Sequence, residues 1–373
     1  DSYFNATSDK YGLVELTTRF GDCLMPEIIP VDIKELKRKK IMKDTLFSPL
    51  LVEKVNAALA RGEQAILFQN RRGFAPLIEC KSCGWVPHCV NCDVSLTYHK
   101  YHNQLVCHYC GYKIQLPPHC PQCQSTELKM MGFGTEKVEE EIATLFPSAK
   151  VERLDFDTAR TRTAYERIIA DFEKGKTQIL IGTQMLSKGL DFGNVSVVGI
   201  LNADNLMNYP DFRAHERAFQ LMVQVSGRAG RRDKRGVVIL QTSQPEHPLI
   251  RMVQHFAYKE MVALQLSERS MFRYPPYYRL IGLVLRSRNE TILQEMSALY
   301  AEKLRVRLGE RVLGPVTPPV TRVQTLHIKK IIMKIEIAAA IAPVREILEA
   351  VYLDMQNQIP FKQLIVHYDV DPA

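Results

Sequence analysis

Apolar residues in the first two thirds of the chain alternate between two patterns. Short unbroken apolar runs indicate strands buried on both faces, and apolar residues spaced three or four apart indicate helices. The sequence therefore predicts strands at 65–68, 151–154, 178–181, 195–201 and 237–240, and helices at 48–61, 135–145, 162–174, 212–227 and up to about 267. Alternation of strand and helix is typical of an α/β domain with a parallel sheet covered on both faces.

The start of the first predicted helix carries its own signal. Ser48 is placed to cap this helix, and Pro49 falls in the first turn, where its missing N–H costs no hydrogen bond. Gly62 is placed to end the same helix.

A different pattern begins after the segment Tyr-Pro-Pro-Tyr-Tyr at 274–278, which we interpret as a domain boundary. Beyond it the sequence predicts a strand at 280–286, a helix at 291–308, a Gly-Pro-rich link at 314–319, a strand at 328–337, a helix at 342–356 and a strand at 363–368. This order predicts a compact α+β domain of about one hundred residues.

The first 45 residues carry short apolar runs and a basic stretch at 34–43, and we expect a connector with one or two strands. The chain opens on Asp1 without an initiator Met or a targeting pattern, so we expect a piece of a longer protein. No apolar run approaches the length of a membrane span, and no membrane partner is expected.

Composition narrows the class of protein only moderately. The 373 residues are 46% hydrophobic and 24% charged, as is ordinary for a soluble protein of two or three domains. Lys and Arg exceed Asp and Glu by eight, 49 against 41. This surplus fits a nucleic-acid partner and fits an ordinary basic surface equally well.

The cysteines are more informative. Eight of the nine form four Cys-x-x-Cys pairs, namely Cys80 and Cys83, Cys89 and Cys92, Cys107 and Cys110, and Cys120 and Cys123. A redox motif needs one such pair, whereas two pairs close one tetrahedral zinc site, so four pairs predict two zinc ions. Zinc thiolates in turn indicate the cytoplasm. Strand and helix alternate both before and after residues 80–123, so these residues are predicted to be an insertion within one domain.

The segment between the inner pairs predicts which cysteines bind each of the two zinc ions. Residues 95–98 and 105–106 flank a polar tip and predict a hairpin, and knuckle, hairpin and knuckle together make a zinc ribbon. The inner cysteines Cys89, Cys92, Cys107 and Cys110 should then share one ion, and the outer four the other. Five histidines lie nearby and are interpreted as bystanders: His88, His99, His102, His108 and His119. Closed sites of this kind are structural, and the module should serve as a rigid surface for DNA or a partner.

The segment 224–231, Gln-Val-Ser-Gly-Arg-Ala-Gly-Arg, resembles motif VI of superfamily 2 helicases. Arg228 and Arg231 follow a predicted helix and could stabilise charge on a phosphoryl group held by another domain. The alternative is a solvated basic loop, since Arg232, Lys234 and Arg235 come next.

Two further segments support a motor. Residues 182–191 follow a predicted strand and resemble motif V, with Thr183 suited to a DNA phosphate and Asp191 to a ribose or to the motif VI arginines. Residues 68–73 also follow a strand and resemble motif IV, although a basic loop is nearly as good an interpretation.

The chain carries no phosphate cradle of its own. Gly175, Lys176 and Thr177 imitate the end of a Walker A loop, but position 170 is Ala where the loop needs Gly. The triplet also follows a helix and precedes a strand, the reverse of the required order. With no Asp-Glu-x-His box either, the ATP-gripping first lobe is expected to lie outside this chain.

Motif IV, four Cys-x-x-Cys pairs, motif V and motif VI in this order resemble the primosomal protein N′ (PriA) family of superfamily 2 replication-restart helicases. Further stretches that carry the resemblance are 70–76, 107–112, 210–214, 274–276, 314–315 and 369–372. The resemblance implies a RecA-like second motor lobe at 46–270, reached by a connector at 1–45, interrupted by a zinc insertion at 80–123 and followed by a C-terminal α/β domain at 271–373.

The resemblance also implies an activity and site residues. It implies ATP-dependent 3′–5′ DNA unwinding at stalled forks, with Mg²⁺, in the bacterial cytoplasm. Implied partners are forked DNA with single-strand/duplex junctions, single-strand-binding protein and other primosome members. Arg228 and Arg231 would act on ATP; nucleotide-binding residues would be Gly189, Asp191, Gln224, Arg228 and Arg231; DNA-binding residues would be Asn70, Arg71, Arg72, Thr183, Gln184 and Lys188.

One position departs from the family pattern, since Asn202 stands where an acidic residue is expected. Two other functions compete with the motor. A zinc-ribbon nucleic-acid-binding module without motor activity would explain the cysteines but leave motifs V and VI as coincidence. A zinc-bearing nuclease or topoisomerase fragment would need an acidic cluster or a catalytic Tyr in context, and neither stands out.

Overall fold

The structure is a computed structural model of the chain. It describes residues 1–16, 24–42, 45–69, 77–91, 94–99, 103–107, 110–130, 135–155, 158–159, 161–187, 192–230, 235–319, 321–323 and 325–372.

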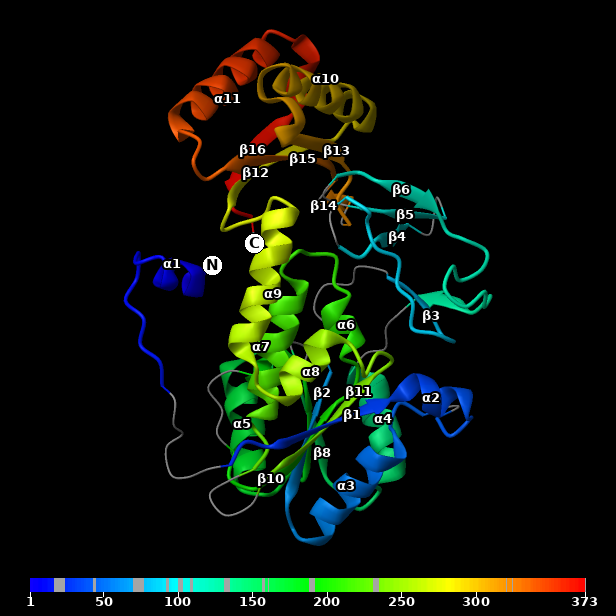
Figure 1. Cartoon of the computed structure of the whole chain (residues 1–373). Helices are drawn as coiled ribbons and strands as arrows, with labels where there is room; N and C mark the ends of the chain where they lie inside the picture. Colours follow the sequence, from blue (N-terminus) through cyan, green and yellow to red (C-terminus); the bar gives the residue numbers. More distant parts are fainter. Residues whose placement is uncertain are drawn as a thin grey trace.

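A six-stranded sheet forms the centre of the larger part of the molecule (Figure 1). Its order is β1 (Glu27–Asp32), β11 (Val237–Thr242), β10 (Val195–Ile200), β2 (Gln64–Phe68), β9 (Ile179–Gly182) and β8 (Val151–Leu154). Every pairing in it is parallel. All residues of β2 and β9 are buried, as the unbroken apolar runs predict. The α/β class with a parallel sheet is confirmed.

Helices cover both faces of this sheet. One face packs against α5 (Arg162–Glu173), α7 (Ala214–Ser226), α8 (Pro248–Gln254) and α9 (Tyr258–Met271), and the other against α3 (Pro49–Ala60) and α4 (Thr135–Leu145). The predicted cap of α3 is present, because Ser48 Oγ accepts a hydrogen bond from the Leu51 N–H. Two short helices, α2 (Ile33–Arg38) and α6 (Asp204–Met207), and the 3-10 turn η2 (Gln184–Ser187) complete this part.

The segment expected to be a connector contributes more than a link. Its strand β1 closes one edge of the sheet, with Ile28 in the core of one face and Ile29 against the core of the other. The short helix α1 (Ser2–Thr7) packs at the far side, where the ring centroids of Tyr3 and Tyr258 lie 5.6 Å apart.

The cysteine module is inserted between β2 and α4. It holds an antiparallel pair, β3 (Ile78–Cys80) with β7 (Leu128–Met130), and a small antiparallel sheet of β4 (Thr97–His99), β5 (Gln104–Val106) and β6 (Lys113–Gln115). The predicted hairpin is confirmed by the pairing of β4 with β5. Figure 1 shows the module beside the C-terminal domain and above the sheet.

The C-terminal part is an antiparallel sheet with two helices on one face. Its path is β13 (Val312–Val316), β15 (Leu326–Glu336), β12 (Tyr278–Ser287) and β16 (Ile365–Val370), and β14 (Arg322–Val323) pairs with β15. Helices α10 (Glu290–Leu308) and α11 (Ile341–Gln356) bury Leu304 and Val351 against this sheet. The turns η3 (Gly309–Arg311) and η4 (Ile359–Gln363) join the elements.

One predicted element of this part is wrong. The Gly-Pro-rich link expected at 314–319 begins inside strand β13, which runs to Val316. The pairing of β13 with β15 shifts register between Leu313 and Val316. At this irregularity Gly314 has φ +97°, and a Cβ would lie 2.8 Å from the Lys330 carbonyl oxygen. Glycine is therefore required by close backbone approach within a strand, and not by a flexible link.

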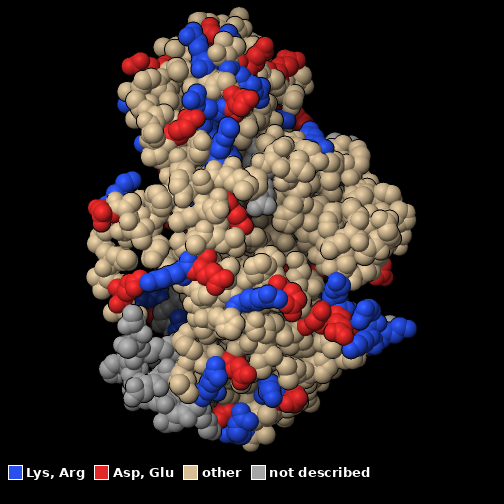
Figure 2. Space-filling view, in the orientation of Figure 1, with Lys and Arg blue, Asp and Glu red and all other residues tan. Residues whose placement is uncertain are grey.

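Charged side chains are mixed over the surface. Figure 2 shows Lys and Arg interspersed with Asp and Glu on the lobe and the C-terminal domain, whereas the cysteine module is nearly free of charge on this side. Among the described helices, none is both long and apolar enough to span a bilayer.

Candidate functional site

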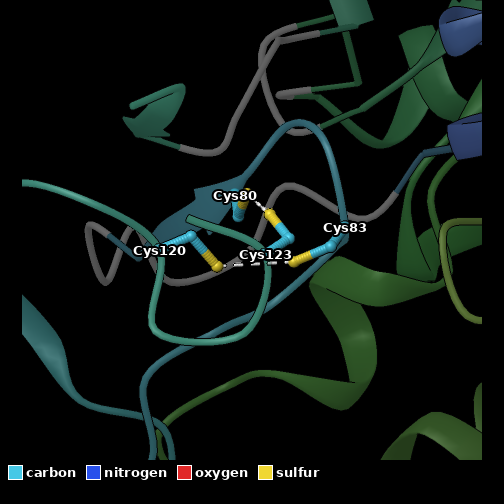
Figure 3. Close-up of side chains that lie close together, drawn as sticks. All are labelled: Cys80, Cys83, Cys120 and Cys123. Carbon is cyan, nitrogen blue, oxygen red and sulfur yellow. Dashed lines mark hydrogen bonds between the residues drawn. The ribbon is translucent and has the colours of Figure 1, made fainter. Parts of the chain in front are cut away.

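Four cysteines from the two outer knuckles meet in space. The sulfur atoms of Cys80, Cys83, Cys120 and Cys123 all lie within 4.8 Å of one another, and Figure 3 shows their side chains turned toward each other. The Sγ–Sγ distances are 3.5 Å for Cys80–Cys123 and 3.4 Å for Cys83–Cys120. A disulfide needs about 2.05 Å, whereas sulfurs about 2.3 Å from a tetrahedral zinc ion lie about 3.8 Å apart. The spacing fits a metal tetrahedron and excludes a disulfide.

The described knuckles share one backbone conformation. The residue after the second cysteine of a knuckle donates its N–H to the carbonyl of the first cysteine, at distances of 2.8, 3.0 and 2.8 Å. These residues are Gly84, Gly111 and Gln124, and all three have positive φ. Glycine adopts this conformation without strain, which explains the residue type at two of the three positions.

The thiols of the outer cluster differ in acidity. Burial raises the pKa of Cys80 and of Cys83. At Cys120 burial acts in the same direction, but hydrogen bonds from the backbone of Cys123 and Gln122 outweigh it and bring the pKa down to about 7. The cluster thus favours one thiolate over its neighbours, and a divalent cation would let all four ionise together.

The inner cluster has the same character. The sulfurs of Cys89, Cys107 and Cys110 lie within 4.8 Å of one another, and Cys89 Sγ is 3.5 Å from Cys110 Sγ. The Tyr112 N–H points to Cys110 Sγ at 3.5 Å, a contact that stabilises a thiolate. Cys92 lies outside the described residues. The structure thus groups the described cysteines as the nested pairing requires, and their binding of zinc stays a prediction.

Among the described residues, no histidine belongs to either cysteine cluster. His88 pairs its backbone with Ser95 in an isolated bridge at the foot of the β4–β5 hairpin. The side chains of His99, His102 and His108 lie outside the described residues, so the prediction that the histidines are bystanders stays a prediction.

A buried carboxylate fastens the cysteine module to the sheet. Asp204, 1% exposed, accepts hydrogen bonds from Thr242 Oγ1 at 2.5 Å and from the Ser243 N–H and Oγ at 2.8 and 2.7 Å. Ser243 Oγ also lies 3.3 Å from Glu79 Oε1, next to the first knuckle. Burial raises the pKa of Asp204, the Thr242 hydroxyl opposes this, and Glu79 raises it further. No pattern in the sequence indicated this link between Asp204 and Glu79.

The described residues expected to contact DNA, Thr183 and Gln184, lie at the carboxyl edge of the sheet. Thr183 follows β9 and is 7% exposed, and Gln184 opens η2. The Gln69 N–H donates to the Gly182 carbonyl at 2.9 Å, so the end of β2 lies beside the start of motif V. Asn70, Arg71, Arg72 and Lys188 lie outside the described residues. Ligands of open α/β sheets bind at this edge.

The described residues expected to contact the nucleotide lie at the opposite edge. Gln224 is exposed in the last turn of α7, and Arg228 sits in the turn that follows it. The Gly230 N–H donates to the carbonyl of Val195, the first residue of β10, at 3.0 Å. Gly236 packs under this turn, where a Cβ would lie 2.3 Å from the Gly230 nitrogen.

Three of the expected nucleotide residues, Gly189, Asp191 and Arg231, lie outside the described residues. The described chain lies at the carboxyl edge up to Ser187 and at the amino edge at Asn194, whose carbonyl accepts a hydrogen bond from the Gln64 N–H at 2.8 Å.

The departure at Asn202 has a local explanation. Its side-chain oxygen accepts a hydrogen bond from the Asn205 N–H at 3.0 Å and so supports the turn that opens α6. An amide serves this purpose as well as a carboxylate would.

Three protein-family models match the chain. The PriA DNA helicase Cys-rich region (CRR) domain matches residues 89–114, the helicase conserved C-terminal domain matches 123–233, and the primosomal protein N C-terminal domain matches 270–373. The first match covers the inner cysteine cluster and its hairpin, which together with the outer cluster has the make-up of structural zinc sites.

The replication restart protein PriA of Bacillus subtilis (strain 168) is 39% identical over 379 residues, which cover 100% of this chain and 46% of that protein. The chain belongs to the PriA family. The PriA of Haemophilus influenzae is 37% identical, covering 86% of this chain and 44% of that protein. The chain thus spans about half the length of the PriA relatives it matches. Among solved structures, the C-terminal domain of the DEAD-box protein Dbp5 matches over 58% of this chain and 91% of that chain at 13% identity, and its TM-score of 0.29 is too low to carry an argument.

The two cysteine clusters predict the metal content of this PriA-family chain. Two zinc ions should co-purify per chain, because each cluster supplies a closed thiolate set. Chelation should unfold residues 80–123 before the sheet, since zinc knuckles fold only with metal. Elemental analysis with hydrogen exchange measures both effects, and a content of one zinc would contradict the two-site assignment.

The grouping of the cysteines predicts which substitutions act together. Cys80→Ser and Cys123→Ser should each release one zinc and loosen the β3–β7 pair, because Cys80 ends β3 and pairs there with Leu128. Cys89→Ser and Cys110→Ser should release the other zinc and loosen the β4–β5 hairpin. Cys23→Ser, outside the four pairs, is the control and should retain both ions. Loosening of the hairpin by Cys80→Ser would rule out the nested pairing.

Proposed function

We propose that the chain is the rear part of an ATP-dependent 3′–5′ DNA helicase that acts at stalled replication forks and in primosome assembly. Membership of the PriA family and the helicase C-terminal match support this. The observation that carries the proposal is the placement of Thr183 and Arg228. Thr183 of the motif V segment and Arg228 of the motif VI segment lie at opposite edges of one sheet. A lobe that binds DNA and completes a nucleotide site needs such an arrangement.

The domain organisation we propose follows the sequence. Residues 1–45 connect to a first motor lobe, 46–270 form the second RecA-like lobe, 80–123 are its zinc insertion and 271–373 are the C-terminal domain. Strand β1 extends the sheet of the lobe into the connector, which supports a firm attachment between the two.

The roles we propose divide along the two edges. At the carboxyl edge Thr183 and Gln184, with Lys188 and residues 70–72, bind the DNA backbone. At the other edge Arg228 and Arg231 stabilise the phosphoryl group of ATP, whose Mg²⁺ and phosphates the first lobe holds. Gly189, Asp191 and Gln224 complete the nucleotide contacts. The two zinc ions hold the insertion in shape and take no part in the chemistry.

The partners we propose are those of the family resemblance: forked DNA with single-strand/duplex junctions, single-strand-binding protein and other primosome members, in the bacterial cytoplasm. A zinc-ribbon module without motor activity remains the alternative to be tested. The composition of the insertion does not favour it, because residues 80–123 contain three Lys and no Arg, and phosphate binding by the insertion alone would need more basic residues.

The carboxyl-edge loops predict weak, salt-sensitive DNA binding by this chain. Phosphate contacts release counterions, so affinity for single-stranded DNA should fall at least about tenfold between about 50 and 200 mM salt. Thr183→Val should weaken binding further by removing one hydroxyl donor. Thr144→Val, on the exposed side of α4, is the matched control. Fluorescence anisotropy measures the affinities, and an affinity unchanged by salt would contradict a phosphate-binding edge.

The motor assignment predicts where ATP hydrolysis is lost. The isolated chain supplies only the arginine side of a nucleotide site and should show no DNA-stimulated ATPase activity. In the full-length protein Arg228→Ala should lower turnover about a thousandfold or more, since such an arginine stabilises transition-state charge. DNA affinity and zinc content should stay unchanged.

Arg162→Ala provides the matched control for this measurement. Arg162 is an exposed arginine of α5 that pairs with Glu166, and its loss should leave turnover unaltered. Robust ATPase activity from the isolated chain would overturn the half-motor proposal. Equal loss of stability and of every activity in Arg228→Ala would indicate a structural arginine instead.

A further inference from the structure

Two stacked aromatic rings join the C-terminal domain to the motor lobe. Phe212 of the lobe and Tyr274 of the segment before β12 lie parallel, with centroids 4.3 Å apart and an interplanar angle of 4°. Lys334 on β15 places its Nζ 3.7 Å from the Tyr274 centroid, and it donates to the Phe272 carbonyl at 2.7 Å. The contact therefore runs without interruption from a strand of the C-terminal domain to Phe212.

Two arginines hold the lobe side of this stack in place. The guanidinium of Arg213 lies 4.2 Å from the Phe212 centroid and donates to the Pro372 carbonyl at 3.1 Å. Arg269 of α9 has a side chain only 3% exposed, lies 5.3 Å from the Phe212 centroid and pairs with Glu216. The buried guanidinium of Arg269 is held by Glu216 and also by Asp1, whose Oδ1 lies 3.0 Å away, and movement that left this charge without a partner would be costly.

These contacts converge on one end of helix α7. Phe212 and Arg213 immediately precede the helix, and Glu216 lies in its first turn. The helix runs from the carboxyl edge of the sheet, where the stack lies, to the amino edge, where Arg228 follows it. Thirteen residues at 1.5 Å each span about 20 Å.

Helix α7 is packed tightly enough to move as a unit. Phe219, Met222 and Val225 form one buried face along it, each exposed by 2% or less, within the core of the lobe. The same helix packs against η2, which carries Gln184 of motif V. Because protein interiors are close-packed, a shift imposed at the Phe212 end is passed to the Arg228 end and is not absorbed between them.

We infer that Phe212, Tyr274 and Lys334 are positioning residues that couple the placement of the C-terminal domain to the position of Arg228. The inference rests on the proposed function, since it assigns these residues to the same ATP site. DNA that displaces the C-terminal domain relative to the lobe would move α7 through the stack, and Arg228 with it. A stack that only fastens two domains would affect stability and leave the response to DNA unaltered.

The test uses the full-length protein and the ratio of ATP turnover with DNA to turnover without DNA. Lys334→Met keeps the aliphatic stem but removes the charge over Tyr274, and this ratio should fall about tenfold, within the usual range of coupling between sites. Lys334→Arg should restore most of the ratio. Lys330→Met is the matched control, because it removes the same charge from the same face of β15 without reaching the rings. Its ratio should equal that of the wild type.

A second variant separates coupling from folding. Phe212→Leu removes the stacked ring on the lobe side. In the double variant Phe212→Leu/Lys334→Met, the turnover ratio should fall no further than in the more affected single variant, since both substitutions act through one contact. DNA affinity and melting temperature of Lys334→Met should match the wild type. If Lys334→Met and Phe212→Leu keep the full ratio, or if their losses multiply, the coupling is overturned. If the wild type shows no stimulation by DNA, the proposed function itself falls.

Discussion

The stacking of Phe212 on Tyr274 holds the three parts of this molecule in one arrangement. Around the two rings a single hydrophobic cluster collects Ile78 and Leu105 of the cysteine module and Ile332 of the C-terminal domain. Aromatic side chains bury large apolar areas, and this one pair packs against residues of all three parts. Without it, each part would expose an apolar face to water, and the relative placement of zinc module, lobe and C-terminal domain would no longer be set.

The carboxyl edge of the motor sheet is held by polar contacts in addition. Asp204 accepts hydrogen bonds from Thr242 and Ser243 at the end of β11, and the Ser243 hydroxyl also contacts Glu79 beside the first cysteine knuckle. Gly84 of that knuckle lies so close to Ser243 that a Cβ would sit 2.9 Å from its hydroxyl. We expect a module with so small a core to fold only with metal, and these contacts connect it to the edge where we propose that DNA binds.

The two edges of the sheet give the lobe separate places for the two ligands that we propose, DNA and nucleotide. Thr183 lies at the carboxyl edge and Arg228 at the amino edge, and helix α7 runs from one edge to the other. A change at one edge thus has a physical route to the other. This arrangement belongs to the lobe itself and does not require the zinc module, whose part is to fix what lies next to the carboxyl edge.

The sequence by itself determined most of the elements and the grouping of the described cysteines. The apolar runs and the helical spacing of apolar residues predicted the parallel sheet and its helices. Ser48 predicted the N-terminal cap of α3, and the spacing of the Cys-x-x-Cys pairs predicted two metal clusters. Each of these signals is local along the chain. Only the tertiary structure revealed that 314–316 form part of a strand, that 27–32 close the sheet, and that Phe212, Tyr274 and Lys334 meet. These residues lie up to 122 positions apart in the sequence, as the numbering of Phe212 and Lys334 shows. Their contact depends on how separate sheets and helices pack, and no local pattern of hydrophobic and polar residues encodes that packing.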